Sequence, residues 1–302
     1  MKGLRKIDYV SQSDSRKDLY PLTHLSTKEE SNNMTICIAV ICENGKKIVI
    51  ACDRMVTVGD IIEFEHDVTK FESLTDTCVV MTSGSTTLQN DVIKQALMNI
   101  KSIKKPSFQQ VTESVKEAYV AIRTKRAEEL YLKPINMSYS SFFEYQKNLV
   151  PEIVFQTTDA IKKAELGVEF ILCGFDDNGG HIHYLVDPGT SECYDAVGFW
   201  AIGTGSLNAI SLFTSHSYAP NFSIGKSIYL AYLAKKEAER APGVGNQTDI
   251  AVLTENGMKH LDDKIIKGLS AIQEKYKKIG NEEYEEVEKI VHGLDDMDGT
   301  AQ

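Results

Sequence analysis

The sequence lacks the features that mark membrane and secreted proteins. Within its 302 residues, no apolar run reaches the roughly 18 residues that a membrane-spanning helix needs. The polar stretch 1–33 has no apolar core of the kind found in a signal peptide. We therefore expect a cytoplasmic protein with no membrane partner.

Basic residues are outnumbered by acidic ones. The chain carries 33 Lys and Arg residues against 43 Asp and Glu residues, a formal net charge of -10. Proteins that bind nucleic acid usually present a broad basic surface, which this balance does not favour. We expect no nucleic-acid partner.

The cysteine pattern offers neither a disulfide framework nor a metal motif. The six cysteines form no CxxC pair, and several lie within apolar strand-like runs, where cysteine acts as a small hydrophobe. We predict buried free thiols, no cofactor and no metal site. His181 and His183 alternate as a metal pair could, but no third ligand stands at a suitable spacing. We interpret them as one exposed face of a sheet.

Hydrophobic periodicity divides the chain into three parts. Residues 1–34 read as a leader, a propeptide or an over-extended start, 35–256 as the folded domain, and 257–302 as a helical tail of two helices broken at Gly280. In the domain, β-branched runs and helical runs alternate as strands, two helices, strands, two helices and a strand. An aromatic-rich insertion occupies about 130–166. Paired helices between strand meanders predict an α+β fold, a four-layer α-β-β-α sandwich of antiparallel sheets.

The first two strands bring candidate chemistry together. "TICIAVIC" and "KIVIACD" flank "ENGK", a strong hairpin signal. If Asn44 and Gly45 form a two-residue turn, Asp53 lies opposite Ile36, and if the loop is 44–47 it lies opposite Ile38. Either register places Asp53 within roughly 10 Å of Thr35. Strict alternation would point the two side chains to opposite faces, but a terminal residue is free to turn inward.

A threonine hydroxyl is a weak nucleophile unless a base lies beside it. A free α-amine on the same residue can be that base, because its ordinary pKa is near 8. Such a site also needs a cation, an acid to hold the cation, and a backbone donor for the oxyanion. Lys70, Asp53 and Gly84 are candidates for these roles. Each residue also has a plain structural alternative: a strand-opening threonine, a surface turn at Asp53 and Arg54, a solvated lysine and a turn glycine.

Several motifs resemble, in order and spacing, the landmarks of proteasome β-type subunits, which are N-terminal nucleophile (Ntn) hydrolases. They are "TICIAVICENGKKIVIACDR", "VTKF", "VVMTSGSTT", "FILCGFDDNGGHIHYLVDPG" and "AIGTGSLNAISLF". The resemblance covers 35–256 apart from the insertion and implies the Ntn hydrolase fold. It also implies that the catalytic residues are the nucleophile Thr35, the acid Asp53, the lysine Lys70, the oxyanion glycine Gly84 and the hydroxyl residue Thr204. Where the family has an aspartate and a serine before the last strand, this chain reads "RAPGVGNQTD", with Thr248 and Asp249 displaced.

The resemblance implies a threonine peptidase that acts on a peptide or protein substrate through an acyl-enzyme on Thr35. Water would resolve the acyl-enzyme by proteolysis, and another amine would resolve it by transpeptidation. The layout of core, insertion and tail is similar to that of the proteasome-like ligases called connectases. The alternative is a non-catalytic proteasome-like structural subunit. Self-association is possible, and because of the bulk of insertion and tail we expect a monomer or small oligomer rather than a ring.

The residue before the predicted nucleophile departs from the family. Proteasome-type propeptides are cut after a glycine, whereas this chain has Met34. Translation from Met34 followed by removal of that methionine would expose Thr35 without autocleavage. We therefore expect Thr35 to be the first residue of the working protein.

Overall fold

The computed structural model describes residues 35–58, 62–65 and 69–291. They belong to one compact unit, Asn32–Gln302. Residues 1–34, which contain the predicted leader, lie outside the described part of the chain.

The first sheet has five antiparallel strands in the order β10-β1-β2-β11-β12. Their bounds are β1 Cys37–Cys42, β2 Lys47–Cys52, β10 Phe199–Ile202, β11 Asp249–Thr254 and β12 Gly257–His260. Cys37 pairs with Cys52 and Cys42 with Lys47, so the hairpin has the register of a turn centred on Asn44 and Gly45. Glu43, Asn44 and Gly45 all have positive φ there, which glycine and asparagine tolerate best.

The second sheet is also antiparallel, in the order β5-β6-β7-β8-β9. Its strands are β5 Phe71–Thr75, β6 Cys78–Gly84, β7 Val168–Asp176, β8 Gly179–Val186 and β9 Thr190–Cys193. A separate two-stranded pair, β3 Met55–Val58 and β4 Ile62–Glu65, lies between β2 and β5 in the sequence.

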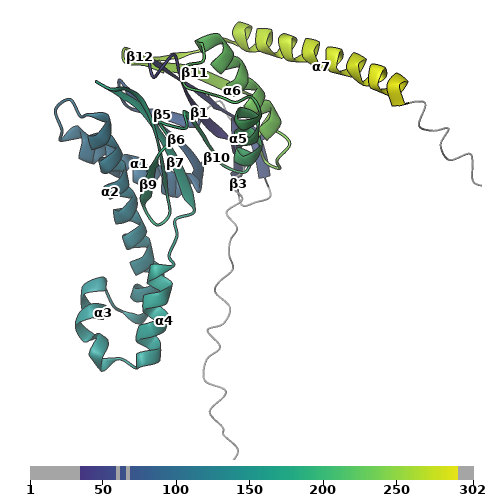
Figure 1. Cartoon of the computed structure of the whole chain (residues 1–302). Coiled ribbons are helices and arrows are strands. Elements are labelled where there is room, and N and C mark those ends of the chain that lie inside the picture. Colours follow the sequence, from purple (N-terminus) through teal and green to yellow (C-terminus); the bar gives the residue numbers. More distant parts are fainter. Residues whose placement is uncertain (1–34, 59–61, 66–68, 292–302) are drawn as a thin grey trace, which may run out of the picture. The chain divides into compact units, whose positions relative to one another are not determined.

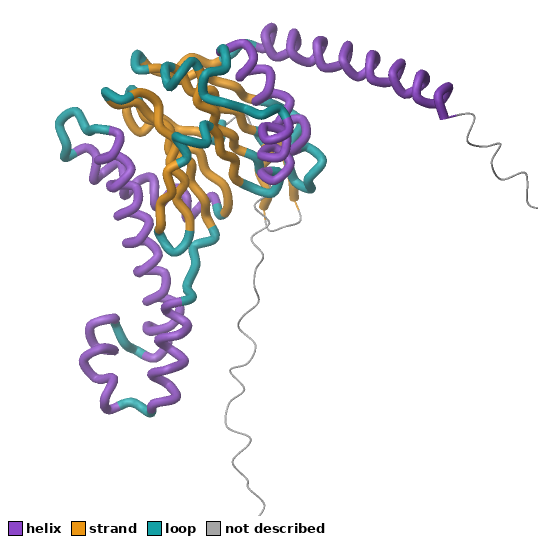
Figure 2. Tube along the Cα trace, in the orientation of Figure 1, coloured by secondary structure: helices purple, strands orange, loops and turns teal. Residues whose placement is uncertain are grey.

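The two sheets pack face to face, as the two layers of strands in Figure 2 show. Alternate residues of β1 explain why its whole sequence is apolar. Cys37, Ala39 and Ile41 enter the core between the sheets, while Ile38 and Val40 enter a second core on the outer face. A strand that is buried on both faces reads as a continuous hydrophobic run.

Helices cover both outer faces (Figure 1). Helices α1 Thr86–Lys101 and α2 Phe108–Ala127 pack on the second sheet, and α5 Ser206–Ser215 and α6 Ile224–Ala238 on the first. Ser107 and Gln110 form a capping box that satisfies backbone donors at the start of α2. The described chain is thus α+β with two five-stranded antiparallel sheets, an arrangement compatible with the predicted α-β-β-α sandwich.

The predicted insertion is helical. After α2 come a short π-helical segment Glu128–Leu132, a 3-10 turn Lys133–Ile135, α3 Tyr139–Tyr145, a second 3-10 turn Gln146–Asn148 and α4 Pro151–Lys162. Several of its large apolar side chains are exposed: Phe143, Tyr145, Val150, Ile153 and Phe155.

The tail differs from the prediction. Residues Gly257–His260 form β12 and pair with β11, and a single helix α7, Asp263–Val291, runs through Gly280 without the predicted break. One glycine costs a helix about 1 kcal/mol, which a long helix can tolerate. Among the described helices, none combines the length and apolarity needed to cross a membrane.

All six cysteines are free, as predicted, but they are not all buried. Five are buried in the sandwich, whereas Cys193 at the end of edge strand β9 is exposed.

Candidate active site

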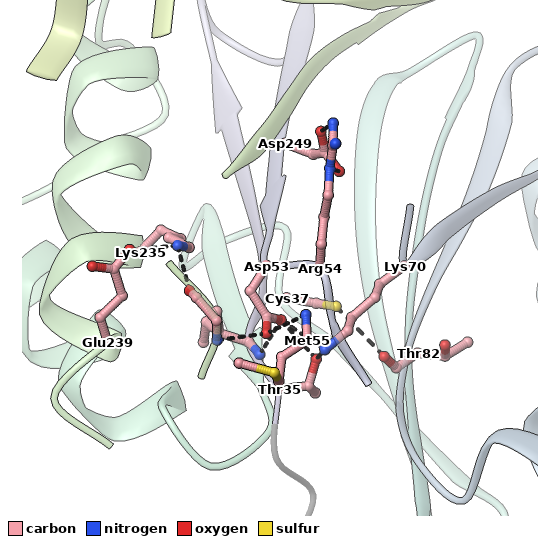
Figure 3. A network of polar contacts seen from close by, with 12 residues as sticks. Thr35, Cys37, Asp53, Arg54, Met55, Lys70, Thr82, Lys235, Glu239 and Asp249 are labelled. Atoms are coloured by element: carbon pink, nitrogen blue, oxygen red, sulfur yellow. Dashed lines mark hydrogen bonds and ion pairs between the residues drawn. The ribbon is translucent and has the colours of Figure 1, made fainter. Parts of the chain in front are cut away.

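Three of the predicted site residues meet at one end of the sandwich. The Thr35 hydroxyl donates to Asp53 Oδ1 at 2.8 Å, and Lys70 Nζ donates to the same oxygen at 2.8 Å. Lys70 Nζ also donates to Thr35 Oγ1. Figure 3 shows Lys70 directed toward both partners. The hydroxyl that sequence reasoning chose as nucleophile therefore lies between an ammonium and a carboxylate.

Asp53 is the centre of this cluster. Its side chain is 0% exposed. Oδ1 also accepts from the backbone N–H of Ile36 at 3.0 Å, and Oδ2 accepts from Met55 N at 3.1 Å and Gly245 N at 2.9 Å. A carboxylate offers about four lone-pair positions. These contacts use the full hydrogen-bonding capacity of the Asp53 carboxylate. Its negative charge is therefore held in place and compensated by the donors around it.

The β1–β2 register explains how Asp53 reaches Thr35. Asp53 N donates to Ile36 O at 3.3 Å, which extends the ladder one step beyond the Cys37–Cys52 pair. Asp53 therefore lies opposite Ile36, the first of the two predicted registers. Thr35 precedes β1 and escapes strict alternation, so its hydroxyl turns to the Asp53 side chain. Thr35 is only 4% exposed.

Gly84 and Thr204 lie on segments that approach the same end. Gly84 ends β6, two residues after Thr82, whose N–H donates to Lys70 O at 3.3 Å. Gly84 has φ of +109°, and a Cβ there would lie 2.2 Å from Gly167 O, so only glycine fits. Thr204 follows Gly203, where a Cβ would lie 2.3 Å from Thr35 O. Thr204 itself is exposed in the turn between β10 and α5.

A buried lysine that sequence reasoning missed supports Asp53 from the other side. Lys235 on α6 is 0% exposed and donates to Gly245 O at 2.7 Å, while its ammonium also pairs with Glu239. Gly245 in turn donates its N–H to Asp53, and Lys235 therefore positions the loop that closes over the carboxylate. Burial lowers the pKa of Lys235, and the Glu239 contact opposes that change. The feature of the sequence that could have revealed Lys235 is its position on the apolar face of α6.

Glu169 is a second missed residue. It accepts from the Gly203 N–H at 3.1 Å and from the Tyr184 hydroxyl at 2.6 Å. These bonds fasten the Gly203 turn, which lies against Thr35, to β7 of the other sheet. An acidic residue inside the apolar run "VEFILCGF" was the only signal in the sequence.

Thr248 and Asp249, the displaced pair at the start of β11, make no hydrogen bond with Thr35 among the residues that the structure describes. Asp249 binds the Arg54 guanidinium through both carboxylate oxygens, at 2.7 and 2.5 Å. The carboxylate of Asp249 thus holds Arg54 rather than Thr35. The Thr248 hydroxyl and, on β6, the Ser83 hydroxyl are buried without a hydrogen-bond partner in the described part of the chain.

Cys37 is the other potential nucleophile beside the cluster. Its thiol donates to Thr82 O at 3.5 Å. Burial raises the pKa of Cys37 to about 12, although the nearby Lys70 charge acts in the opposite direction. A thiol needs to be deprotonated to attack, and Cys37 is therefore inert near neutral pH. Thr35 is the better candidate.

No protein-family model and no curated protein sequence matches this chain.

Proposed function

We propose that the chain is an Ntn hydrolase of the proteasome type that cleaves or exchanges peptide bonds through an acyl-enzyme on Thr35. One observation carries the proposal. The Thr35 hydroxyl contacts both Lys70 and the fully buried Asp53 at the start of a strand. A structural role for this threonine needs neither a buried carboxylate nor a lysine beside it.

The first chemical step would be attack of Thr35 Oγ1 on an amide carbonyl. The hydroxyl proton passes to the Thr35 α-amine, directly or through water, and the new C–O bond forms as the carbonyl becomes an oxyanion. The Lys70 ammonium stabilises charge that develops on Oγ1, since a positive charge within contact distance favours an alkoxide. The Gly84 N–H is the proposed donor to the oxyanion.

Collapse of the tetrahedral intermediate breaks the C–N bond. The leaving amine takes the proton held by the α-amine, and Thr35 keeps the acyl group as an ester. Water then gives a carboxylic acid and free enzyme, or a second amine gives a new amide. The described residues serve both outcomes equally, so hydrolysis and transpeptidation are both within the proposal.

This mechanism requires a free α-amine on Thr35. The bond between Met34 and Thr35 must therefore be absent from the active form, whether through removal of an initiating methionine or through cleavage of a longer precursor. In the full chain the same nitrogen is an amide and cannot accept the proton.

The direct test is covalent labelling with a peptide epoxyketone or β-lactone, read by intact mass and peptide mapping. The chain is prepared from a fusion whose cleavage leaves Thr35 as the first residue, and the full chain with Met34 joined to Thr35 serves as the matched control. We expect one label per chain, on Thr35, in the first preparation only. N-terminal sequencing of protein from its native source shows whether that form exists.

Variants separate chemistry from folding. Thr35→Ser should keep the label and Thr35→Ala should lose it, while Lys70→Met should slow labelling by about 10²–10⁴-fold because it removes the charge beside the nucleophile. Folding of each variant is checked by circular dichroism. A processed, folded protein that never labels on Thr35 would favour the non-catalytic proteasome-like subunit instead.

A further inference from the structure

A second cluster of chemically active side chains lies on the outer face of the second sheet. Ile182 of β8 enters the core between the sheets, and its neighbours His181 and His183 therefore face the other way. There they meet Phe108 at the start of α2, with ring centroids 5.1 and 5.0 Å apart, respectively. The two histidines share a face as predicted, but they are half-buried rather than exposed.

Two further potential ligands, which the sequence did not show, come from the end of the edge strand and the segment after it, and they lie near His183 rather than His181. His183 pairs with Cys193 in the β8–β9 ladder, and Asp195 follows two residues later. One potential ligand atom each from His183, Cys193 and Asp195 lies within 4.8 Å of the other two. The Cys193 side chain is exposed, which leaves the cluster open to solvent.

The carboxylate of this cluster is already oriented. Asp195 Oδ1 accepts from Ile182 N at 2.7 Å, and Oδ2 contacts His181 Nδ1 at 2.6 Å. Asp176 Oδ1 lies 2.8 Å from His181 Nε2 on the other side of the ring. Metal-binding carboxylates and histidines commonly have such outer partners, which hold the ligand atoms in position. Each Asp195 oxygen keeps a further lone pair.

We propose that His183, Cys193 and Asp195 bind a borderline divalent cation of the zinc class. An imidazole and a thiol distinguish this set from the all-oxygen sites that Mg²⁺ and Ca²⁺ prefer. Zinc bonds of about 2.0–2.3 Å require the three atoms to close by roughly an ångström, within the reach of side-chain rotation. Binding replaces the Cys193 S–H proton with a metal–sulfur bond and releases the proton to water.

The structural context indicates what such an ion does. It would tie β9, an edge strand, to β8 and to the segment after Cys193, beside the start of α2. Three protein ligands leave a fourth position for water or for a group from a partner molecule. The site lies on the opposite face of the sheet from the core between the sheets, and the proposal does not depend on catalysis at Thr35.

The test is calorimetric titration of the chelator-treated full chain with a zinc salt. We expect one ion per chain, and at least tenfold weaker binding in both Cys193→Ser and His183→Ala, since each variant removes one of the three ligands. The matched control is His216→Ala, at an exposed histidine whose Nδ1 lies 3.0 Å from Leu212 O of its own helix. Cobalt substitution adds a specific signature, a thiolate-to-cobalt charge-transfer absorption that Cys193→Ser abolishes.

Two results would overturn the proposal. One is the absence of stoichiometric binding by folded protein, and the other is binding that survives both ligand substitutions unchanged. Circular dichroism of each variant excludes loss of binding through unfolding. Thr35→Ala should bind zinc normally, so failure of this proposal and failure of the catalytic proposal are distinguishable.

Discussion

Two aspartates in this chain have similar partners but opposite surroundings. Asp53 and Asp195 each accept a backbone N–H and contact a basic side chain, Lys70 for the first and His181 for the second. Asp53, however, is 0% exposed and accepts from three further donors. The Asp195 side chain is 31% exposed, at the edge of the second sheet.

The difference separates two uses of a carboxylate. Asp53 has no capacity left for a ligand, and so it can only position its neighbours and fix their charge. Asp195 keeps lone pairs and access to water, and so it can accept a ligand. A closed cluster suits a site whose electrostatics must not rearrange during reaction, and an open cluster suits binding.

The largest effect is expected in the free energy of unfolding of two variants, Asp53→Asn and Asp195→Asn, both measured without metal. Removing one partner of a buried ion pair costs about 3–5 kcal/mol of unfolding free energy, because the other charge stays buried without compensation. We expect a loss of that size for Asp53→Asn. Asp195→Asn breaks a partly exposed contact and should cost about 1 kcal/mol or less. Urea denaturation followed by circular dichroism measures both changes.

Equal losses in the two variants would break the comparison. In that case Asp53 would be solvated to the same degree as Asp195, and the closed cluster would not exist. Because the stability change is read on the full chain, it does not depend on whether Thr35 has a free amine.

The next test concerns how tightly each cluster is packed. Gly203→Ala would place a Cβ 2.3 Å from Thr35 O at a φ of +93°, whereas Gly174→Ala would place one 2.4 Å from the Phe108 ring beside His181. The Thr35 backbone oxygen and the positive φ at Gly203 cannot adjust to the new Cβ, whereas the Phe108 ring beside Gly174 can shift. We expect a loss of about 2–4 kcal/mol for Gly203→Ala and about 1–3 kcal/mol for Gly174→Ala.

Gly225→Ala on α6 is the matched control. Its Cβ would meet nothing within 4 Å, and alanine is a better helix former than glycine by up to about 1 kcal/mol. In thermal unfolding, the melting temperature should therefore be lowest for Gly203→Ala, intermediate for Gly174→Ala and highest for Gly225→Ala. A tolerated Gly203→Ala would show that the turn does not press on Thr35.

Local patterns were enough to predict the approach of Asp53 to Thr35. The Asn44-Gly45 turn limits the hairpin to two registers, and in both of them Asp53 falls near the start of the first strand. The alternation of strands and helix pairs likewise predicts the α+β class, since each element buries the face that its own periodicity defines.

Contacts between distant segments were beyond sequence reasoning. Lys235 reaches Asp53 through Gly245, and Cys193 meets His183 only because β9 folds back onto β8. Neither partner lies at a diagnostic spacing. The continuity of α7 through Gly280 was missed for another reason: helix propensity is a weak preference that the rest of a long helix can outweigh.

The smallest expected effect concerns the reactivity of individual thiols, which extends the comparison of the two clusters to single cysteines. Cys37 lies beside the closed cluster, where burial raises its pKa to about 12, and burial likewise raises that of Cys78 to about 12 and that of Cys42 to about 11. Partial burial also raises the pKa of Cys193, but this thiol is exposed to solvent in the open cluster. Iodoacetamide near pH 8 should therefore modify native protein once, at Cys193, and unfolded protein at all six cysteines.

Zinc should protect that one cysteine. At a free zinc concentration about ten times the dissociation constant, the modification rate of Cys193 should fall about tenfold, because only the metal-free fraction reacts. Peptide mapping by mass spectrometry follows the site, and Cys193→Ser should leave the native chain unmodified. Rapid modification of Cys37 would show that the cluster around Asp53 opens to solvent, and unprotected Cys193 at saturating zinc would show that its sulfur is not a ligand.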